Sequence, residues 1–195
     1  MEIISSDNKN IAKFLVSAFS GNPTIKKHWD KEEYSSVDIL SCQDSPIKTV
    51  NSFGTVGLSD FPLIKNGEEY PANIEILGAC NEKYADFSNI IATAAFCIIN
   101  SQWFCSPGIV FPDIVLMYYP GYEMKHLYFT YPFLWKGEFE PYKLDSKSVS
   151  WLMAIPVSDQ EKDFVLDNGP ERLEELFLEN NIDVCELTRN SIIGV

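Results

Sequence analysis

Two carboxylates and a lysine form the arrangement in this sequence that comes closest to a catalytic site. Asp113 follows a proline, and Glu123 stands two positions before Lys125. Metal-dependent nucleases of the PD-(D/E)xK type hold a divalent cation with such carboxylates, and the lysine assists the attacking water. Both carboxylates must reach one metal ion, so the elements that carry them decide whether this chemistry can occur.

The segments around these residues predict a hairpin that keeps the two carboxylates apart. Residues 114–119 and 126–131 read as strands, and Pro120-Gly121 between them suits a type II turn. Asp113 and Glu123 would then lie about five residues apart along the strands, or roughly 17 Å at ~3.3 Å per residue. Oxygen ligands lie only ~2–2.6 Å from a metal ion. We therefore predict no metal site here, only charged side chains at strand ends.

The other reactive side chains are dispersed. The five cysteines show no C-x-x-C spacing, and several lie in apolar runs that raise a thiol pKa. Two histidines remain: His28, expected at the surface, and His126, expected on a strand. The loop at Gly54-Thr55-Val56-Gly57 lacks the lysine of a phosphate-binding loop. We predict no enzyme, no catalytic residues, no metal and no cofactor, with reduced cysteines that suit a cytoplasmic protein. The cysteines are Cys42, Cys80, Cys97, Cys105 and Cys185.

Two other features could bind a partner, and the first is an aromatic segment. Residues 131–142 hold five aromatic rings between prolines and a glycine that resist regular structure. Trp135 is its candidate anchor, because tryptophan is enriched at interface centres. The same rings could instead fold back as a lid on a sheet, since large exposed apolar patches are rare on monomers.

The second feature is an acidic helix near the C-terminus, whose buried face is marked by Leu173, Leu176 and Phe177. Like charges four residues apart destabilise an isolated helix by ~0.2–0.5 kcal/mol per pair. A basic partner would offset that cost, and an ordinary solvated face is the alternative interpretation. The candidate partner-binding carboxylates are Glu171, Glu174, Glu175, Glu179 and Asp183.

Strong local signals mark the elements that carry this helix. Residues 151–157 form a nearly continuous apolar run, which predicts a buried strand. Ser158 and Glu161 have the spacing of a capping box, in which each side chain bonds the other residue's backbone N–H. Gly169-Pro170 is then expected to end one helix and to open the next.

Earlier in the chain, hydrophobic patterns predict helices at residues 7–19 and 85–102 and strands at 37–42, 49–59 and 73–80. Strands in succession followed by helices favour an α+β fold over a doubly wound one. No linker, repeat or low-complexity tract divides the chain. We therefore predict a single domain over residues 1–195, with helices packed on a mixed, mostly antiparallel β-sheet.

The net charge of −13 is unevenly distributed. Residues 159–195 carry ten Asp/Glu against three Lys/Arg, a net charge of −7, whereas the first thirty residues carry +1. Such a protein is repelled by nucleic acids and anionic membranes and attracted to a basic protein, although charge also simply keeps proteins soluble. The N-terminus lacks the features of a secretory signal. The longest apolar run, residues 90–99, is too short to span a bilayer.

Several motifs resemble those of the suppressor-of-fused family. The central motif is Thr55-x-Gly57-x-Ser59. The closing motifs are W-L-M-A-I-P-V-S-D-Q-E from Trp151, G-x-E-x-L-x-x-L-F from Gly169 and L-T-R-N-S from Leu187. The opening of the chain is similar to one bacterial branch, the single-domain antitoxins encoded beside secreted LXG-type toxins.

This resemblance implies a cytoplasmic antitoxin, or immunity protein, that neutralises the basic C-terminal domain of an LXG-type toxin by direct occlusion. The expected toxin class is a DNase, whose DNA-binding surface must be basic. The animal members grip a peptide between two domains, and that clamp does not carry over to a single domain. The alternative function is a regulatory module that captures an extended peptide by strand addition at a free sheet edge.

Overall fold

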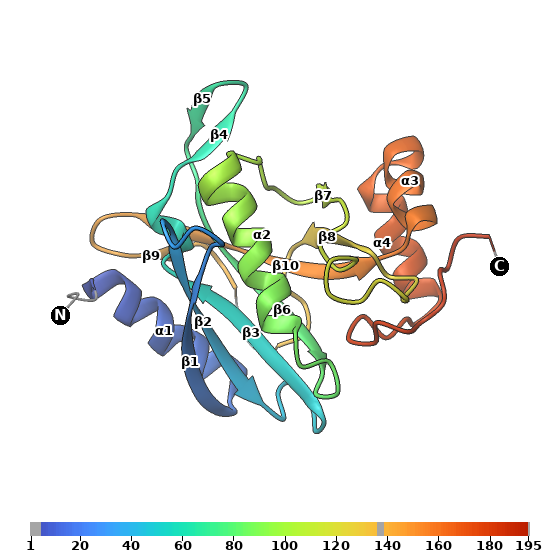
Figure 1. Cartoon of the computed structure of the whole chain (residues 1–195), viewed down its shortest axis with the longest axis horizontal. Coiled ribbons are helices and arrows are strands. Elements are labelled where there is room, and N and C mark those ends of the chain that lie inside the picture. Colours follow the sequence, from blue (N-terminus) through green and yellow to red (C-terminus); the bar gives the residue numbers. More distant parts are fainter. Residues whose placement is uncertain (1–4, 136–138, 195) are drawn as a thin grey trace.

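The computed structural model describes residues 5–135 and 139–194, and its centre is an eight-stranded sheet (Figure 1). Neighbouring strands are antiparallel except β6 and β10, which pair in parallel. This arrangement confirms the predicted α+β fold with a mixed, mostly antiparallel sheet. The strands of the sheet follow the order β1 (Asn22–Trp29), β2 (Ser36–Gln43), β3 (Val50–Val56), β6 (Asn73–Asn81), β10 (Ser148–Val157), β8 (His126–Thr130) and β7 (Val110–Phe111). The short strand β9 (Tyr142–Lys143) pairs with β10. A separate two-stranded hairpin consists of β4 (Leu63–Lys65) and β5 (Glu68–Tyr70).

Helices cover both faces of this sheet. α2 (Phe87–Ser101) packs on one face, where its apolar side chains join those of the sheet in one core cluster. α1 (Ser6–Phe19), α3 (Asp159–Asn168) and α4 (Pro170–Glu179) contribute to the cluster on the other face. Figure 1 shows α1 near one end of the sheet and the α3–α4 pair near the other. None of the helices that the structure describes is long and apolar enough to cross a membrane.

The local signals around β10, α3 and α4 are confirmed. The Ser158 hydroxyl accepts the Glu161 amide at 3.1 Å, and the Glu161 carboxylate accepts the Ser158 amide at 3.1 Å. Gly169 ends α3 with a φ of +87°, which favours glycine, and Pro170 is the first residue of α4. These contacts fix where α3 begins, where it ends and where α4 starts.

The predicted hairpin over residues 114–131 is wrong. Residues 114–119 form turns in which the Tyr118 and Tyr119 amides donate to the Val115 carbonyl, and β8 pairs instead with β7 and β10. An apolar run fits a strand, but buried turns need apolar side chains too, and Val115 is fully buried. The separation calculated from that hairpin therefore does not hold.

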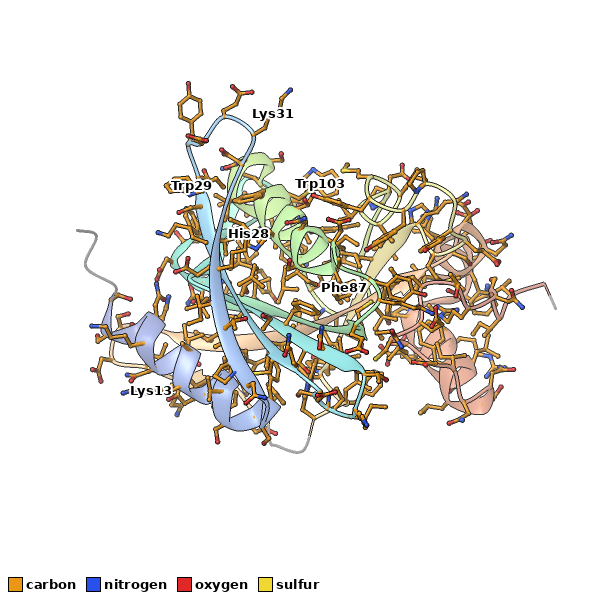
Figure 2. All side chains as sticks on the ribbon, turned by 60° about the horizontal axis from the view of Figure 1, so that its bottom comes forward. Lys13, His28, Trp29, Lys31, Phe87 and Trp103 are labelled. Carbon is orange, nitrogen blue, oxygen red and sulfur yellow. The ribbon has the colours of Figure 1, made fainter. Side chains whose placement is uncertain are left out.

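Edge strand β1 was not predicted. Its sequence is polar and begins Asn22-Pro23, yet it pairs with β2 along its whole length. Seven of its eight residues are exposed, so it lacks the alternation that marks a half-buried strand. His28, expected at the surface, is the buried exception, while the neighbouring Trp29 is 52% exposed (Figure 2). The outer edge of β1 has no strand partner among the described residues.

Candidate partner-binding surface

Helix α4 is held against the sheet by one side only. Leu173 and Phe177 are buried in the core cluster that includes β8 and β10, as predicted. Leu176 was expected in the same core, but it lies three residues from Leu173, toward the helix flank, and is only partly buried. α3 also packs against α4, and the face of α4 that carries Glu171, Glu175 and Glu179 is exposed.

Among the acidic residues of α4, Glu174 differs from its neighbours. It is partly buried, and its Oε1 accepts hydrogen bonds from the Tyr128 hydroxyl at 2.7 Å and from Thr130 Oγ1 at 2.5 Å. Burial, together with the bond to Glu174 and its negative charge, raises the pKa of Tyr128. Glu174 is therefore tied to the sheet and is not a freely exposed carboxylate.

The other predicted carboxylates are exposed. Arg172 pairs with Glu175 at 2.7 Å and with Glu179 at 3.2 Å, and these bonds raise the pKa of its guanidinium. Glu171 stands at the N-terminal turn of α4, and exposed Asp183 accepts the Cys185 amide at 2.9 Å. Exposed ion pairs stabilise a protein by only ~0–1 kcal/mol, so the pairs on α4 leave these charges available to a partner.

The aromatic segment folds back as a lid, the second of its two interpretations, so Trp135 is buried and does not present an exposed anchor. Its ring is 6% exposed, lies 5.1 Å from that of Phe19, and donates its indole N–H to Ser52 Oγ at 2.6 Å. A lid is the physical solution because it removes a large apolar ring from water. Tyr131 and Phe133 remain 70% and 57% exposed. Residues 136–138 of the segment lie outside the described residues.

Two hollows flank Phe133. A pocket of about 190 Å³ lies between β8, β10 and α4, with the 80%-exposed Leu178 in its wall. A groove of about 650 Å³ runs between the C-terminal end of α1, the β2–β3 turn, residues 133–135 and residues 182–185. We call the apolar centre and its acidic rim together the C-terminal surface. It comprises Tyr131, Phe133 and Leu178, with Glu171, Glu175, Glu179 and Asp183 as the rim.

The closing motifs form an internal anchor behind this surface. Glu161 is fully buried, and its two oxygens accept Arg189 Nη1 and Nη2 at 2.6 and 2.8 Å. Arg189 also donates to the Pro156 carbonyl at 3.0 Å, and Glu161 accepts the Ile192 amide at 3.1 Å. This clasp fixes the C-terminal tail to α3 and β10.

The central motif is a cradle for a second buried carboxylate, Glu75. It accepts the Thr55 hydroxyl at 2.5 Å, the Gly57 amide at 3.0 Å, and both the amide and the hydroxyl of Ser59 at 3.1 and 2.7 Å. Burial raises the pKa of Glu75, and these donors oppose the shift. Gly57 turns into the cradle with a φ of +100°. The Thr-x-Gly-x-Ser motif therefore serves the interior of the molecule.

Asp113 and Lys125 of the nuclease-like pattern join one network, because His126 Nε2 lies 2.9 Å from Asp159 Oδ1, whereas Glu123 engages a different partner. The Asp113 amide donates to His126 Nδ1 at 2.8 Å, Glu123 accepts the Ser191 amide at 3.1 Å, and Lys125 pairs with Asp159. Within the described parts of the chain, no group of three or more His, Cys, Asp or Glu side chains is placed to hold a metal ion.

The cysteines are free thiols placed as the sequence predicts. Four are buried, and Cys97 is partly buried. Burial raises the pKa of Cys97 to about 11 and that of Cys185 to about 12, where the charge of Asp183 adds to the effect. Thiols with such values are almost entirely protonated near neutral pH, and the thiolate is the nucleophile.

The fold and this surface define an α+β protein with a mixed sheet, whose long sequence motifs form internal anchors and whose acidic helix is exposed. The chain belongs to the suppressor of fused family, whose model matches residues 33–190. It is 36% identical to the immunity protein YqcF of Bacillus subtilis over 190 residues, which cover 97% of this chain and 99% of that protein.

Solved structures show the same fold. A suppressor of fused homologue from Neisseria gonorrhoeae superposes with a TM-score of 0.69 at 17% identity, covering 97% of this chain and 98% of that chain. Drosophila Suppressor of Fused superposes with a TM-score of 0.63 at 10% identity, covering 93% of this chain but 50% of that chain. The fold therefore matches half of the Drosophila protein.

Proposed function

We propose that the chain is a cytoplasmic immunity protein that acts as one domain and neutralises a cognate toxin by binding it directly. The observation that carries the proposal is the 36% identity to the immunity protein YqcF along almost the whole of both chains. The partner is the basic C-terminal domain of an LXG-type toxin, with a DNase as the toxin class.

The C-terminal surface supports direct occlusion as the mechanism. An interface commonly combines an apolar centre with a polar rim, and Phe133 and Leu178 supply the centre here. The rim lies in the part of the chain that carries a net charge of −7. A DNase domain must present a basic face to phosphates, and an acidic rim would compete for that face.

The test starts from the toxin domain encoded beside this chain. The purified domain is assayed for DNA cleavage with increasing amounts of the chain, and binding is measured by titration calorimetry. We expect stoichiometric inhibition and a complex that weakens as salt increases. A cleaving toxin that neither binds nor is inhibited would contradict the proposal.

In this function the chain itself does not hydrolyse DNA. Incubation of the chain alone with DNA and Mg²⁺ should leave the DNA intact. Cleavage that disappears in Asp113→Ala and Glu123→Ala would instead restore the nuclease interpretation. Lys125→Ala is the third member of this series, and cleavage that survives all three changes would come from another site or from a contaminating enzyme.

Peptide capture by strand addition is the second candidate function. The unpaired outer edge of β1 favours it, since an edge strand presents free backbone groups to an extended segment. Lys26 and Lys27 on β1 would select an acidic peptide, whereas the rim on α4 selects a basic partner. Peptides tiled from the toxin domain distinguish the two functions, because a folded interface is not reproduced by any single short peptide.

A further inference from the structure

The pocket between α4, β8 and β10 has almost entirely apolar walls and one charged group. It holds about 190 Å³, and Glu174 is the only ionisable residue among the described residues that line it. It opens beside Phe133 and Leu178, two of the three exposed apolar side chains at the centre of the C-terminal surface. The lining residues are Thr130, Phe133, Ile155, Glu174, Phe177 and Leu178.

The Glu174 carboxylate is oriented but not neutralised. Both of its hydrogen bonds, from Tyr128 and Thr130, are accepted by Oε1. Among the residues that the structure describes, no cation pairs with Glu174, and Arg172 on the same helix pairs with Glu175 and Glu179 instead. A charge against apolar walls is costly unless an opposite charge compensates it.

We propose that this pocket receives a lysine or arginine side chain of the basic partner. The aliphatic stem lies against Ile155 and Leu178, and the cationic group meets Glu174. The inference rests on the proposed antitoxin function and specifies the type of partner side chain that the pocket selects. Long basic side chains suit the pocket because they bury an apolar stem while placing a charge at its tip. The exposed ring of Phe133 offers a cation–π contribution, whereas the guanidinium of Arg189 already lies over the ring of Phe177 at 5.6 Å.

An apolar partner side chain fits the same walls less well. It would cover Glu174 without supplying a counter-charge, and a covered, unpaired carboxylate opposes binding. An acidic side chain would be repelled by Glu174. The pocket therefore discriminates by charge, although most of its surface is carbon.

The first test needs no toxin. Methyl groups of Ile155 and Leu178 are followed by NMR while n-butylguanidinium or pentan-1-ol is added to the full chain. We expect the guanidinium to shift both methyls at lower concentration than the alcohol. Glu174→Gln keeps an acceptor for Tyr128 and Thr130 but removes the charge, and should weaken the guanidinium titration by about tenfold. Equal titrations by the two probes, or an unchanged Glu174→Gln titration, would overturn the inference.

Asp167→Asn is the matched control, because it removes the same charge from an exposed position on α3. In the complex with the toxin domain, Glu174→Gln should raise the dissociation rate about tenfold, and Asp167→Asn should leave it unchanged. A bound toxin that dissociates equally fast from wild type and Glu174→Gln would overturn the pocket and leave the antitoxin function standing. A toxin that never binds would end the antitoxin function, and the NMR titrations would still decide what the pocket accepts.

Discussion

Two regions of this molecule place glutamates in opposite environments, one buried in the interior and one exposed on α4. Glu75 and Glu161 are fully buried and accept several hydrogen bonds each, whereas the side chains of Glu175 and Glu179 are 61% and 57% exposed. The motifs that carry the family resemblance encode the donors around the buried pair. In the motif G-x-E-x-L-x-x-L-F, Glu174 and Glu175 occupy positions that the motif leaves open. The buried glutamates are therefore held by motif residues, whereas Glu174 and Glu175 stand at open motif positions and Glu171 is the one rim residue that this motif specifies.

The Glu161–Arg189 clasp gives the largest effect that this comparison predicts. Arg189→Ala leaves a buried carboxylate without its cation, which costs about 3–5 kcal/mol. Urea unfolding measures the loss, and Arg172→Ala on α4 is the matched control because its ion pairs are exposed and contribute only ~0–1 kcal/mol. Similar losses of stability in the two variants would show that the buried ion pair contributes no more to the fold than the exposed ones.

The Glu75 cradle is expected to give the next largest effect. Glu75→Gln keeps one acceptor oxygen but turns an NH₂ group toward hydroxyl and amide donors, so at least one buried donor loses its partner. We expect a loss of about 1–3 kcal/mol in the free energy of unfolding. Glu69→Gln on exposed β5 is the control, with a change within ~0.5 kcal/mol. A Glu75→Gln variant as stable as this control would show that the Glu75 cradle does not stabilise the fold.

The features that could be predicted from the sequence are those set by residues close together in the chain. Ser158 and Glu161 are three positions apart, so their capping box could be identified without a fold. Arg189 lies 28 residues beyond Glu161, and nothing between them indicates that the two meet. Glu174 and Glu175 look alike in sequence, because Tyr128 and Thr130, which bind only Glu174, lie more than forty residues away.

The wrong predictions have the same origin. An apolar run such as residues 114–119 fits a strand or a buried turn, and only packing decides between them. Trp135 could be an anchor or a lid, and its hydrogen bond to Ser52, 83 residues away, settles it as a lid. β1 was missed because an edge strand with two lysines has no apolar face to reveal it.

The smallest effect on stability, with a clear effect on binding, is expected at the rim of α4. Replacing Glu171, Glu175 and Glu179 together by Gln should change the free energy of unfolding by no more than ~0.5 kcal/mol, because all three are exposed. Association with the toxin domain should slow, since electrostatic steering raises association rates from ~10⁵–10⁶ toward ~10⁸ M⁻¹s⁻¹ at low salt. Stopped-flow mixing of the chain with the toxin domain measures this rate.

The salt dependence of that rate tests the same comparison. The screening length falls from about 30 Å at 0.01 M to about 8 Å at physiological salt, so a steered reaction slows as salt is added. The triple variant should show a flatter dependence than wild type. Its dissociation rate should change little, in contrast to Glu174→Gln, because a rim charge acts before contact and a pocket charge acts after it. Identical association rates and salt slopes for wild type and the triple variant would place the interface away from α4, and the β1 edge would become the surface to test.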